Sequence, residues 1–176
     1  TFKATMQNGD TVTAQVERFC SLSNSKQAAF RYTFTLDNDA EMRISSYIDG
    51  NVANEDSNYD QKFWKGISAK AHENSSLLIC ETKKTEFQVA VQAFTSITVD
   101  GKEVNFTEQR VKPKSAKITA TLKAKKGQDI VIDKRATILS SLDIAKEDLE
   151  TLARENCRKN CHRPFDELKT EHAAAW

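Results

Sequence analysis

Apolar and polar residues alternate with a period of two in several stretches of the first 140 residues. In AAFRYTFTL, the side chains of Ala28, Phe30, Tyr32, Phe34 and Leu36 share one face of an extended chain, and the arginine and threonines between them share the other. The stretches EMRISSYID, FQVAVQAF and KITATLKA alternate in the same way. Because each stretch has one apolar face, we expect antiparallel strands whose other face is in water.

Residues typical of tight turns separate these stretches. They are Asn8-Gly9, Asp37-Asn38-Asp39, Asp100-Gly101 and Lys126-Gly127. About ten short strands with no helix between them favour two packed sheets. We therefore predict a mainly β fold, an antiparallel β-sandwich, over residues 1–140.

The pattern changes from strand to helix near Ser140. An apolar stripe with a spacing of three or four residues follows, and it predicts a helix. The stripe consists of Leu149, Leu152, Ala153, Cys157 and Cys161. We expect this helix to begin around Ile144, with Ser141 or Asp143 as its N-cap, because short polar side chains accept the free amide hydrogens of a first turn.

A second helix is predicted after Pro164, which suits a first helical turn. Phe165, Leu168, His172 and Trp176 would line its face at i, i+3, i+7 and i+11. The chain stops on an apolar tryptophan without a C-cap glycine, so we expect an excised segment whose last helix leads into another domain. Residues 141–176 would then be a helical linker, and its apolar stripe would pack on that domain or on the sandwich.

Composition narrows the classes of partner. The 26 basic and 25 acidic residues give a net charge of +1, which argues against a nucleic acid or a polybasic membrane contact. No apolar run reaches the roughly 18 residues of a membrane span. The four cysteines lie in strand-like or helical apolar positions, which favours free thiols in a reducing compartment, and we expect the cytoplasm.

Neither a metal site nor a cofactor site is indicated by the motifs. Cys157 and Cys161 could offer two zinc ligands, but a closed zinc site needs four, and both thiols extend the helical stripe. His172 lies between apolar positions, so we interpret it as a packing residue or as a contact to a partner domain. With three histidines in all, no pairing of nucleophile and base emerges, and glycine-rich phosphate loops are absent from the sequence.

The stretch DGNVANEDSNYDQKFW, Asp49–Trp64, is the most polar candidate for a site. As a calcium loop it has Asn54 where the turn glycine belongs and Asp60 where a bidentate glutamate belongs. As an acid/base site it offers Glu55, Asp56 and Asp60, but a glycosidase needs two carboxyl groups about 5–10 Å apart and one of them in a dry pocket. We therefore interpret it as a long loop between strands.

Such a loop can still contact another surface. Its aromatic rings suit the flat faces of sugars, and its amides and carboxylates suit hydroxyl groups. We predict an interface or a sugar-facing loop formed by Asn54, Glu55, Asp56, Asn58, Tyr59, Asp60, Phe63 and Trp64.

Four long motifs carry a resemblance to a known family. They are RFCSLSNSKQAAFRYTFT, SYIDGNVANEDSNYDQKFW, CETKKTEFQVAV and PFDELKTEHAAAW. Together they resemble the N-terminal domain of glycoside hydrolase family 65, which holds the maltose, trehalose and kojibiose phosphorylases. The wording NEDSNYD is most similar to the maltose-type members.

The resemblance implies a super-sandwich of the galactose mutarotase type, of which residues 1–140 would be the later part, joined by linker helices to an (α/α)6 barrel. In that family the barrel carries the catalytic glutamate and the phosphate site, so no catalytic residue carries over to this chain, and only the parent protein would be an enzyme. The parent would bind a carbohydrate and inorganic phosphate and would form β-glucose 1-phosphate and glucose with inversion. We expect the chain to support its own barrel and a homodimer. The alternative is a carbohydrate-binding module that uses the Asn54–Trp64 loop.

Overall fold

The protein is described by a computed structural model, which describes residues 1–5, 9–53 and 61–176. The described strands are β1 (Phe2–Thr5), β2 (Thr11–Cys20), β3 (Gln27–Leu36), β4 (Ala40–Asp49), β5 (Trp64–His72), β6 (Ser75–Thr82), β7 (Gln88–Val99), β8 (Lys102–Glu103), β9 (Glu108–Lys112), β10 (Ser115–Ala124) and β11 (Asp129–Ser140). The helices are a 3-10 turn η1 (Lys146–Asp148), α1 (Leu149–Asn160) and α2 (Phe165–Ala174).

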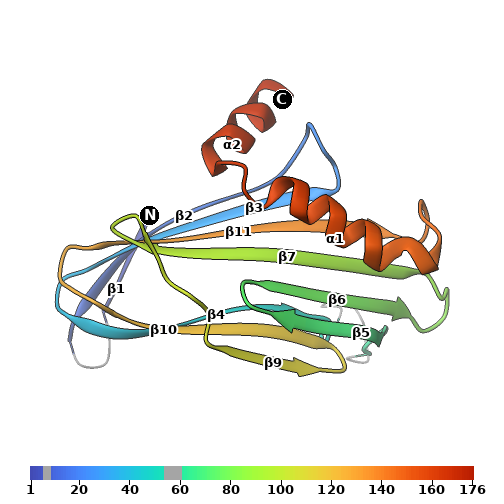
Figure 1. Cartoon of the computed structure of the whole chain (residues 1–176), viewed down its shortest axis with the longest axis horizontal. Helices are drawn as coiled ribbons and strands as arrows, with labels where there is room; N and C mark the ends of the chain where they lie inside the picture. The colour runs from blue at the N-terminus through green and yellow to red at the C-terminus, as the bar shows by residue number, and fades with distance from the viewer. Residues whose placement is uncertain (6–8, 54–60) are drawn as a thin grey trace.

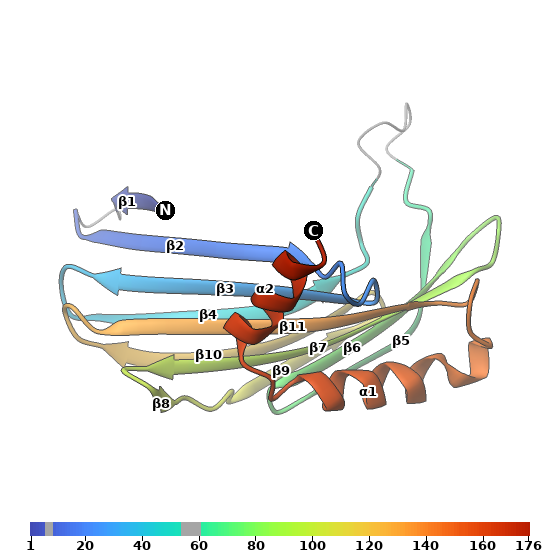
Figure 2. The same cartoon turned by 90° about the horizontal axis from the view of Figure 1, so that it is seen from above.

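The described strands form two antiparallel sheets. The large sheet has the order β1-β2-β3-β11-β7-β6-β5, and β8 pairs with β7. The small sheet has the order β4-β10-β9 and packs beneath the large one (Figures 1 and 2). The predicted mainly β fold with an antiparallel sandwich and two C-terminal helices is therefore confirmed.

The core between the sheets follows from the alternation along the strands. Strand β10 places Ile118, Ala120 and Leu122 inward, and each is buried. Strand β11 lies between β3 and β7 and adds Ile130, which is fully buried. The same cluster is completed by Leu36, Ile44, Ile97, Phe106 and Ala124.

The outer face of the large sheet is covered by helices in its middle, where the sequence had predicted water. Helix α1 lies along β7 and β11 (Figure 1). Leu149 and Ala153 of α1 are fully buried there, against a patch formed by Leu77, Ile79, Ala90 and Leu139. Strand β6 supplies part of that patch because its LLIC run is apolar on both faces, as is typical of a strand covered on both sides.

The predicted start of the first helix is wrong. Helix α1 begins at Leu149 behind the η1 turn, and Asp148 occupies its N-cap. Ser141 cannot cap a helix because it continues the pairing of β11 with β7: its N–H donates to the Gln88 carbonyl, and its hydroxyl accepts the Gln88 N–H, both at 2.8 Å. The stripe itself is confirmed, with Leu149, Ala153 and Cys157 buried.

The turn predictions hold where the structure describes them. Asp100 and Gly101 have φ values of 47° and 78° and connect β7 to β8. Asp37-Asn38-Asp39 connects β3 to β4, and Lys126-Gly127 lies between β10 and β11. Asn8 lies outside the described residues. Neither helix of the described part has the length and hydropathy of a membrane span.

Truncation of Leu149 tests whether α1 is held by packing. We expect Leu149→Ala to lower the free energy of unfolding by about 2–4 kcal/mol, because a fully buried leucine leaves a cavity when it is shortened. Urea denaturation measures it. The matched control is Leu142→Ala, since Leu142 is 74% exposed, and it should change stability by less than about 0.5 kcal/mol. Equal effects of the two variants would contradict the packing of α1 on the sheet.

Candidate functional site

The base of the Asp49–Trp64 segment lies at one end of the sandwich. The segment leaves β4 at Asp49 and enters β5 at Trp64. Its two described limbs are joined by a bond from Lys62 Nζ to Asn51 Oδ1 (3.1 Å), and the Asn51 N–H donates to the carboxylate of Asp49 (2.8 Å). The predicted contact residues Asn54, Glu55, Asp56, Asn58, Tyr59 and Asp60 lie outside the described residues.

Phe63 and Trp64 are half-buried against the sandwich. The Trp64 ring meets Phe87 edge to face, with 6.0 Å between ring centroids. The Phe63 carbonyl accepts a hydrogen bond from the Lys83 N–H (2.9 Å). Both residues therefore fasten the end of the segment to the loop between β6 and β7.

An apolar cavity of about 210 Å³ lies under this base. Its lining comprises Ile48, Asp49, Gly50, Val52, Trp64, Leu78, Cys80, Val89 and Val91. Burial raises the pKa of the Cys80 thiol in its wall. The volume is below the roughly 300–1,000 Å³ of small-molecule sites, so the cavity suits an apolar side chain better than a sugar.

Gly50 is required at the wall of this cavity. A Cβ at this position would lie 2.6 Å from the Cys80 sulfur and 3.1 Å from a methyl carbon of Leu78. The Gly50 N–H also donates to the Lys114 carbonyl (2.8 Å), which extends the pairing of β4 with β10. The close approach explains why a glycine follows Asp49, the last residue of β4.

A basic basin of about 430 Å³ lies beside the same base. Arg110, Lys112, Lys114 and Lys117 line it, together with Asp49, Asn51, Pro113 and Ser115. Four cations against one carboxylate make the basin positive, so it suits an acidic surface or an anion. The sequence had not singled it out, because its cations are spread over β9, the following turn and β10.

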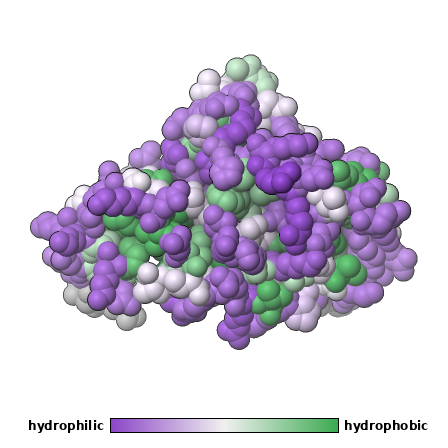
Figure 3. Space-filling view, in the orientation of Figure 1, coloured by the Kyte–Doolittle hydropathy of each residue, from purple (hydrophilic) through white to green (hydrophobic). Residues whose placement is uncertain are grey.

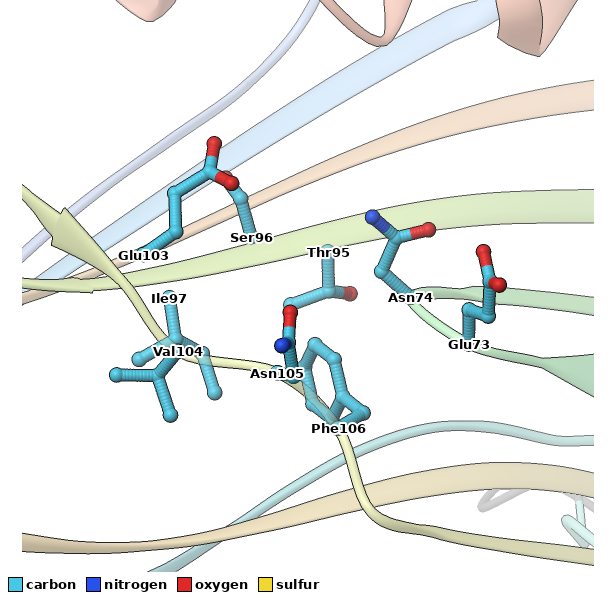
Figure 4. Close-up of a pocket in the computed structure, with 9 residues that line it drawn as sticks. All are labelled: Glu73, Asn74, Thr95, Ser96, Ile97, Glu103, Val104, Asn105 and Phe106. Carbon is cyan, nitrogen blue, oxygen red and sulfur yellow. The ribbon is translucent and has the colours of Figure 1, made fainter.

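A third hollow, of about 410 Å³, is lined by both polar and apolar residues (Figure 4). Its residues are Glu73, Asn74, Thr95, Ser96, Ile97, Glu103, Val104, Asn105 and Phe106. Figure 4 shows Glu73 and Glu103 at opposite ends of it. Figure 3 shows mostly hydrophilic surface on this face, with hydrophobic surface inside the hollow on its left half. Sequence reasoning missed it because three separate segments meet there.

Helix α2 is anchored to the large sheet through Arg31. The guanidinium donates to Asp133 on β11 from Nε (2.7 Å) and from its terminal nitrogen (2.8 Å). A third bond reaches Asp166 on α2 (3.0 Å), and the charge lies 4.5 Å from the centre of the Phe165 ring. The hydrogen bonds to Asp133 and Asp166 raise the pKa of Arg31. One residue thus ties two strands and a helix together.

The apolar face of α2 rests on the sandwich. Phe165 and Leu168 are buried with Ala29 and Phe19. The His172 ring stacks on Phe19 at 4.8 Å, and its Nδ1 accepts the N–H of Leu22 (3.3 Å). The packing interpretation of His172 is thus confirmed.

The prediction that Trp176 lines the face of α2 is wrong. Helix α2 ends at Ala174, and Trp176 is 94% exposed. Its side chain lies beyond the last turn, so it does not extend the apolar face made by Phe165 and Leu168.

The cysteines of α1 act as apolar side chains. Cys157 and Cys161 are buried, and burial raises the pKa of Cys157 to about 12. All four cysteines are free thiols. In residues 1–5, 9–53 and 61–176, no three His, Cys, Asp or Glu side chains are grouped to hold a metal ion.

A model of a known protein family matches the whole chain. The family model described as "Glycosyl hydrolase family 65, N-terminal domain" matches residues 1–176. A curated relative, "Maltose phosphorylase" from Bacillus subtilis (strain 168), is 29% identical over 174 residues, which cover 94% of this chain and 22% of the relative.

A solved structure shares the fold. "Putative kojibiose phosphorylase from human microbiome" superposes with a TM-score of 0.82 at 14% sequence identity, over 95% of this chain and 21% of that chain. The chain therefore spans about a fifth of the length of both relatives.

Removal of the Arg31 charge tests the anchor of α2. We expect Arg31→Met to cost about 1–3 kcal/mol in the free energy of unfolding, because Asp133, whose side chain is 13% exposed, would lose two short hydrogen bonds and keep Arg135 at 3.6 Å. Chemical denaturation measures the change. Arg43→Met is the control, since the Arg43–Glu108 pair is 62% and 57% exposed and should contribute less than about 1 kcal/mol. A loss as small as the control's would refute the anchor.

A double-mutant cycle tests the close approach at Gly50. We expect Gly50→Ala to destabilise the protein by about 1–3 kcal/mol, because the added methyl group overlaps the Cys80 sulfur. In a Cys80→Ala background the same substitution should cost at least about 1 kcal/mol less, since the overlapping sulfur is gone. Thermal denaturation of the four proteins measures the coupling. Additive effects would show that the overlap is not the cause.

Proposed function

Because the chain belongs to the N-terminal domain of glycosyl hydrolase family 65, we propose that it is the non-catalytic β-sandwich and linker of an α-glucoside phosphorylase. The match over residues 1–176 carries this proposal. Residues 1–140 would be the sandwich and residues 141–176 the linker toward an (α/α)6 catalytic barrel. The chain's share of about a fifth of its relatives supports a role as one part of a larger enzyme.

The whole protein would perform phosphorolysis of an α-glucoside. The curated relative is called a maltose phosphorylase and the structural neighbour a putative kojibiose phosphorylase, so maltose and kojibiose are the first substrates to test, with trehalose as the third. Inorganic phosphate would attack the sugar with inversion and release β-glucose 1-phosphate and glucose. The catalytic glutamate and the phosphate site would belong to the barrel, and the enzyme would be a cytoplasmic homodimer.

The role of this chain would be architectural. The end of the sandwich at Asp49 and Trp64 would face the barrel or a second subunit. The positive basin supports this, because it suits an acidic protein surface, and so does the apolar cavity beneath Gly50 and Val52. Val52 is 46% exposed, as a contact residue at the mouth of that cavity would be before its partner binds.

The Asn54–Trp64 loop as a carbohydrate-binding surface has less support. The Trp64 ring already packs against Phe87, and the cavity beside it is apolar. A sugar platform needs an open ring face with hydroxyl-binding groups around it. Support of the barrel therefore accounts better for the described residues.

Phosphorolysis assays on the full-length protein and on the 1–176 chain test the proposal. With inorganic phosphate and maltose, kojibiose or trehalose, the full-length protein should form β-glucose 1-phosphate from one of them. The chain of residues 1–176 should form none above a blank, because the catalytic glutamate and the phosphate site would belong to the barrel. Product formed by the chain alone would disprove the non-catalytic role. A full-length protein inactive on all three disaccharides would disprove the enzyme class.

Calorimetry distinguishes the architectural role from the carbohydrate-binding alternative. Titration of the 1–176 chain with maltose up to millimolar concentration should give no binding heat. Saturable heat that Trp64→Ala removes would instead favour the carbohydrate-binding role. Phe87→Ala is the control, since it loosens the Trp64 ring without removing it.

A further inference from the structure

The basic basin lies on the outer face of the small sheet. Figure 1 shows this sheet on the side of the sandwich away from α1 and α2. Along β10, Ala116 and Ile118 are fully buried within the sandwich. Lys117 and Ser115 alternate with them, so both face outward and line the basin.

The strand register brings basic side chains together on this face. Arg110 of β9 lies directly opposite Lys117, and Lys112 lies opposite Ser115. Residues directly opposite each other have Cβ atoms only about 4.5–5.5 Å apart, and like charges there destabilise a sheet. Lys114 adds a charge from the turn between β9 and β10, and this turn is held in place because the Lys114 carbonyl accepts the N–H of the residue after β4 (2.8 Å).

The cations of the basin have no counterion among the described residues. None of them takes part in a salt bridge with any residue of the described ranges. On the same face, by contrast, Arg43 of β4 binds Glu108 at 2.7 Å. Asp49 is the carboxylate in the described lining, and it already accepts the N–H of Asn51 (2.8 Å). The basin therefore carries an excess of positive charge that a bound anion would neutralise.

The basin has room for a small molecule as well as a phosphate group. Its volume of about 430 Å³ falls within the roughly 300–1,000 Å³ of small-molecule sites. Ser115 lies between Asp49 on β4 and Lys112 on β9, so acceptors and cations occupy opposite sides of the basin. Carboxylate, amide and hydroxyl groups bind sugar hydroxyls, and cations bind a phosphoryl group. The two sides suit the two ends of a phosphorylated sugar.

We propose that the basic basin binds a phosphorylated sugar. The phosphoryl group, which carries a charge of about −1.5 to −2 at neutral pH, lies among Arg110, Lys112 and Lys117. The sugar hydroxyls lie toward Asp49 and Asn51, because the Asp49 carboxylate repels the phosphoryl group.

The bound ligand has a place in the proposed enzyme. It neutralises the basin where the barrel or a second subunit would pack. β-Glucose 1-phosphate is the phosphorylated sugar that the whole protein would form, so the choice of this sugar rests on the proposed function.

Titration calorimetry of the 1–176 chain at low ionic strength with β-glucose 1-phosphate tests the site. We expect saturable binding, and the double substitution Arg110→Gln with Lys117→Gln should raise the Kd at least about tenfold, because two charge-assisted contacts are lost. The control is Lys123→Gln with Lys125→Gln, which removes the same charge from the other end of β10 and should change the Kd less than about twofold. Equal effects of the two pairs would overturn the proposal.

Inorganic phosphate as a second probe shows whether the sugar is recognised. Phosphate alone should bind at least about tenfold more weakly than β-glucose 1-phosphate, because it lacks the hydroxyl groups that face Asp49 and Asn51. Maltose, which lacks the phosphoryl group, should give no binding heat. Equal affinities for phosphate and β-glucose 1-phosphate would overturn the proposal.

Thermal denaturation gives a readout without ligand. Because Arg110 and Lys117 repel each other across β9 and β10, Arg110→Gln should raise the Tm of the 1–176 chain at low salt by about 1–2 °C. Saturating β-glucose 1-phosphate should raise the Tm of the unsubstituted chain more than that of the variant. A fall in Tm on substitution would show that the chain itself supports this charge, and it would overturn the proposal.

The full-length protein tests whether another part of the polypeptide fills the basin. We expect Arg110→Gln with Lys117→Gln to remove one bound molecule of β-glucose 1-phosphate per subunit. If an acidic face of the barrel or of a second subunit occupies the basin instead, the number of bound molecules will not change, and the proposal is wrong.

The site and the proposed function can fail separately. A full-length protein that performs phosphorolysis, together with a 1–176 chain that binds no phosphorylated sugar, overturns the site and leaves the proposed function intact. A chain that binds β-glucose 1-phosphate in the basin, together with a full-length protein inactive on all three disaccharides, supports the site and disproves the proposed function.

Discussion

The middle strands of the large sheet bury both of their faces, and the rest of the structure follows from how they do so. Strand β11 runs between β3 and β7, and its inner side chains meet the small sheet while its outer ones meet the helices. Burial of apolar area on both faces is the main source of stability for such a layered fold, at about 25 cal/mol per Å². Arg31 joins the layers, because it binds β11 through Asp133 and α2 through Asp166.

This arrangement determines on which side of the sheet the C-terminal helices lie. Helices α1 and α2 lie on one face of the sheet (Figure 1), so the polypeptide leaves the sandwich on that side. The basic basin and the apolar cavity lie where β4 ends. These two surfaces differ in character, because one is positively charged and the other is apolar. If the chain has the proposed architectural role, these are the surfaces where the barrel or a second subunit would pack.

The sequence predicted most of the strands, because apolar and polar residues alternate with a period of two along β3, β4, β7 and β10. The start of α1 was not predictable in this way, since Ser141 resembles an N-cap and only its pairing with Gln88 shows otherwise. Arg31 and Asp133 are 102 residues apart, so their pair depends on the order of strands in the sheet. The hollow between Glu73 and Glu103 likewise requires three segments to meet. The role of the Asn54–Trp64 loop stays a prediction, because most of its residues lie outside the described part of the chain.

An experimental structure of the full-length protein tests the central claim most directly. If the chain is the architectural N-terminal part of a family 65 phosphorylase, residues 1–176 will keep the sandwich with α1 and α2 on its outer face. A helical barrel will follow α2, and the end of the sandwich at Asp49 and Trp64 will contact that barrel or a second subunit. A sandwich that is tethered without contact to any other part of the protein would contradict the account.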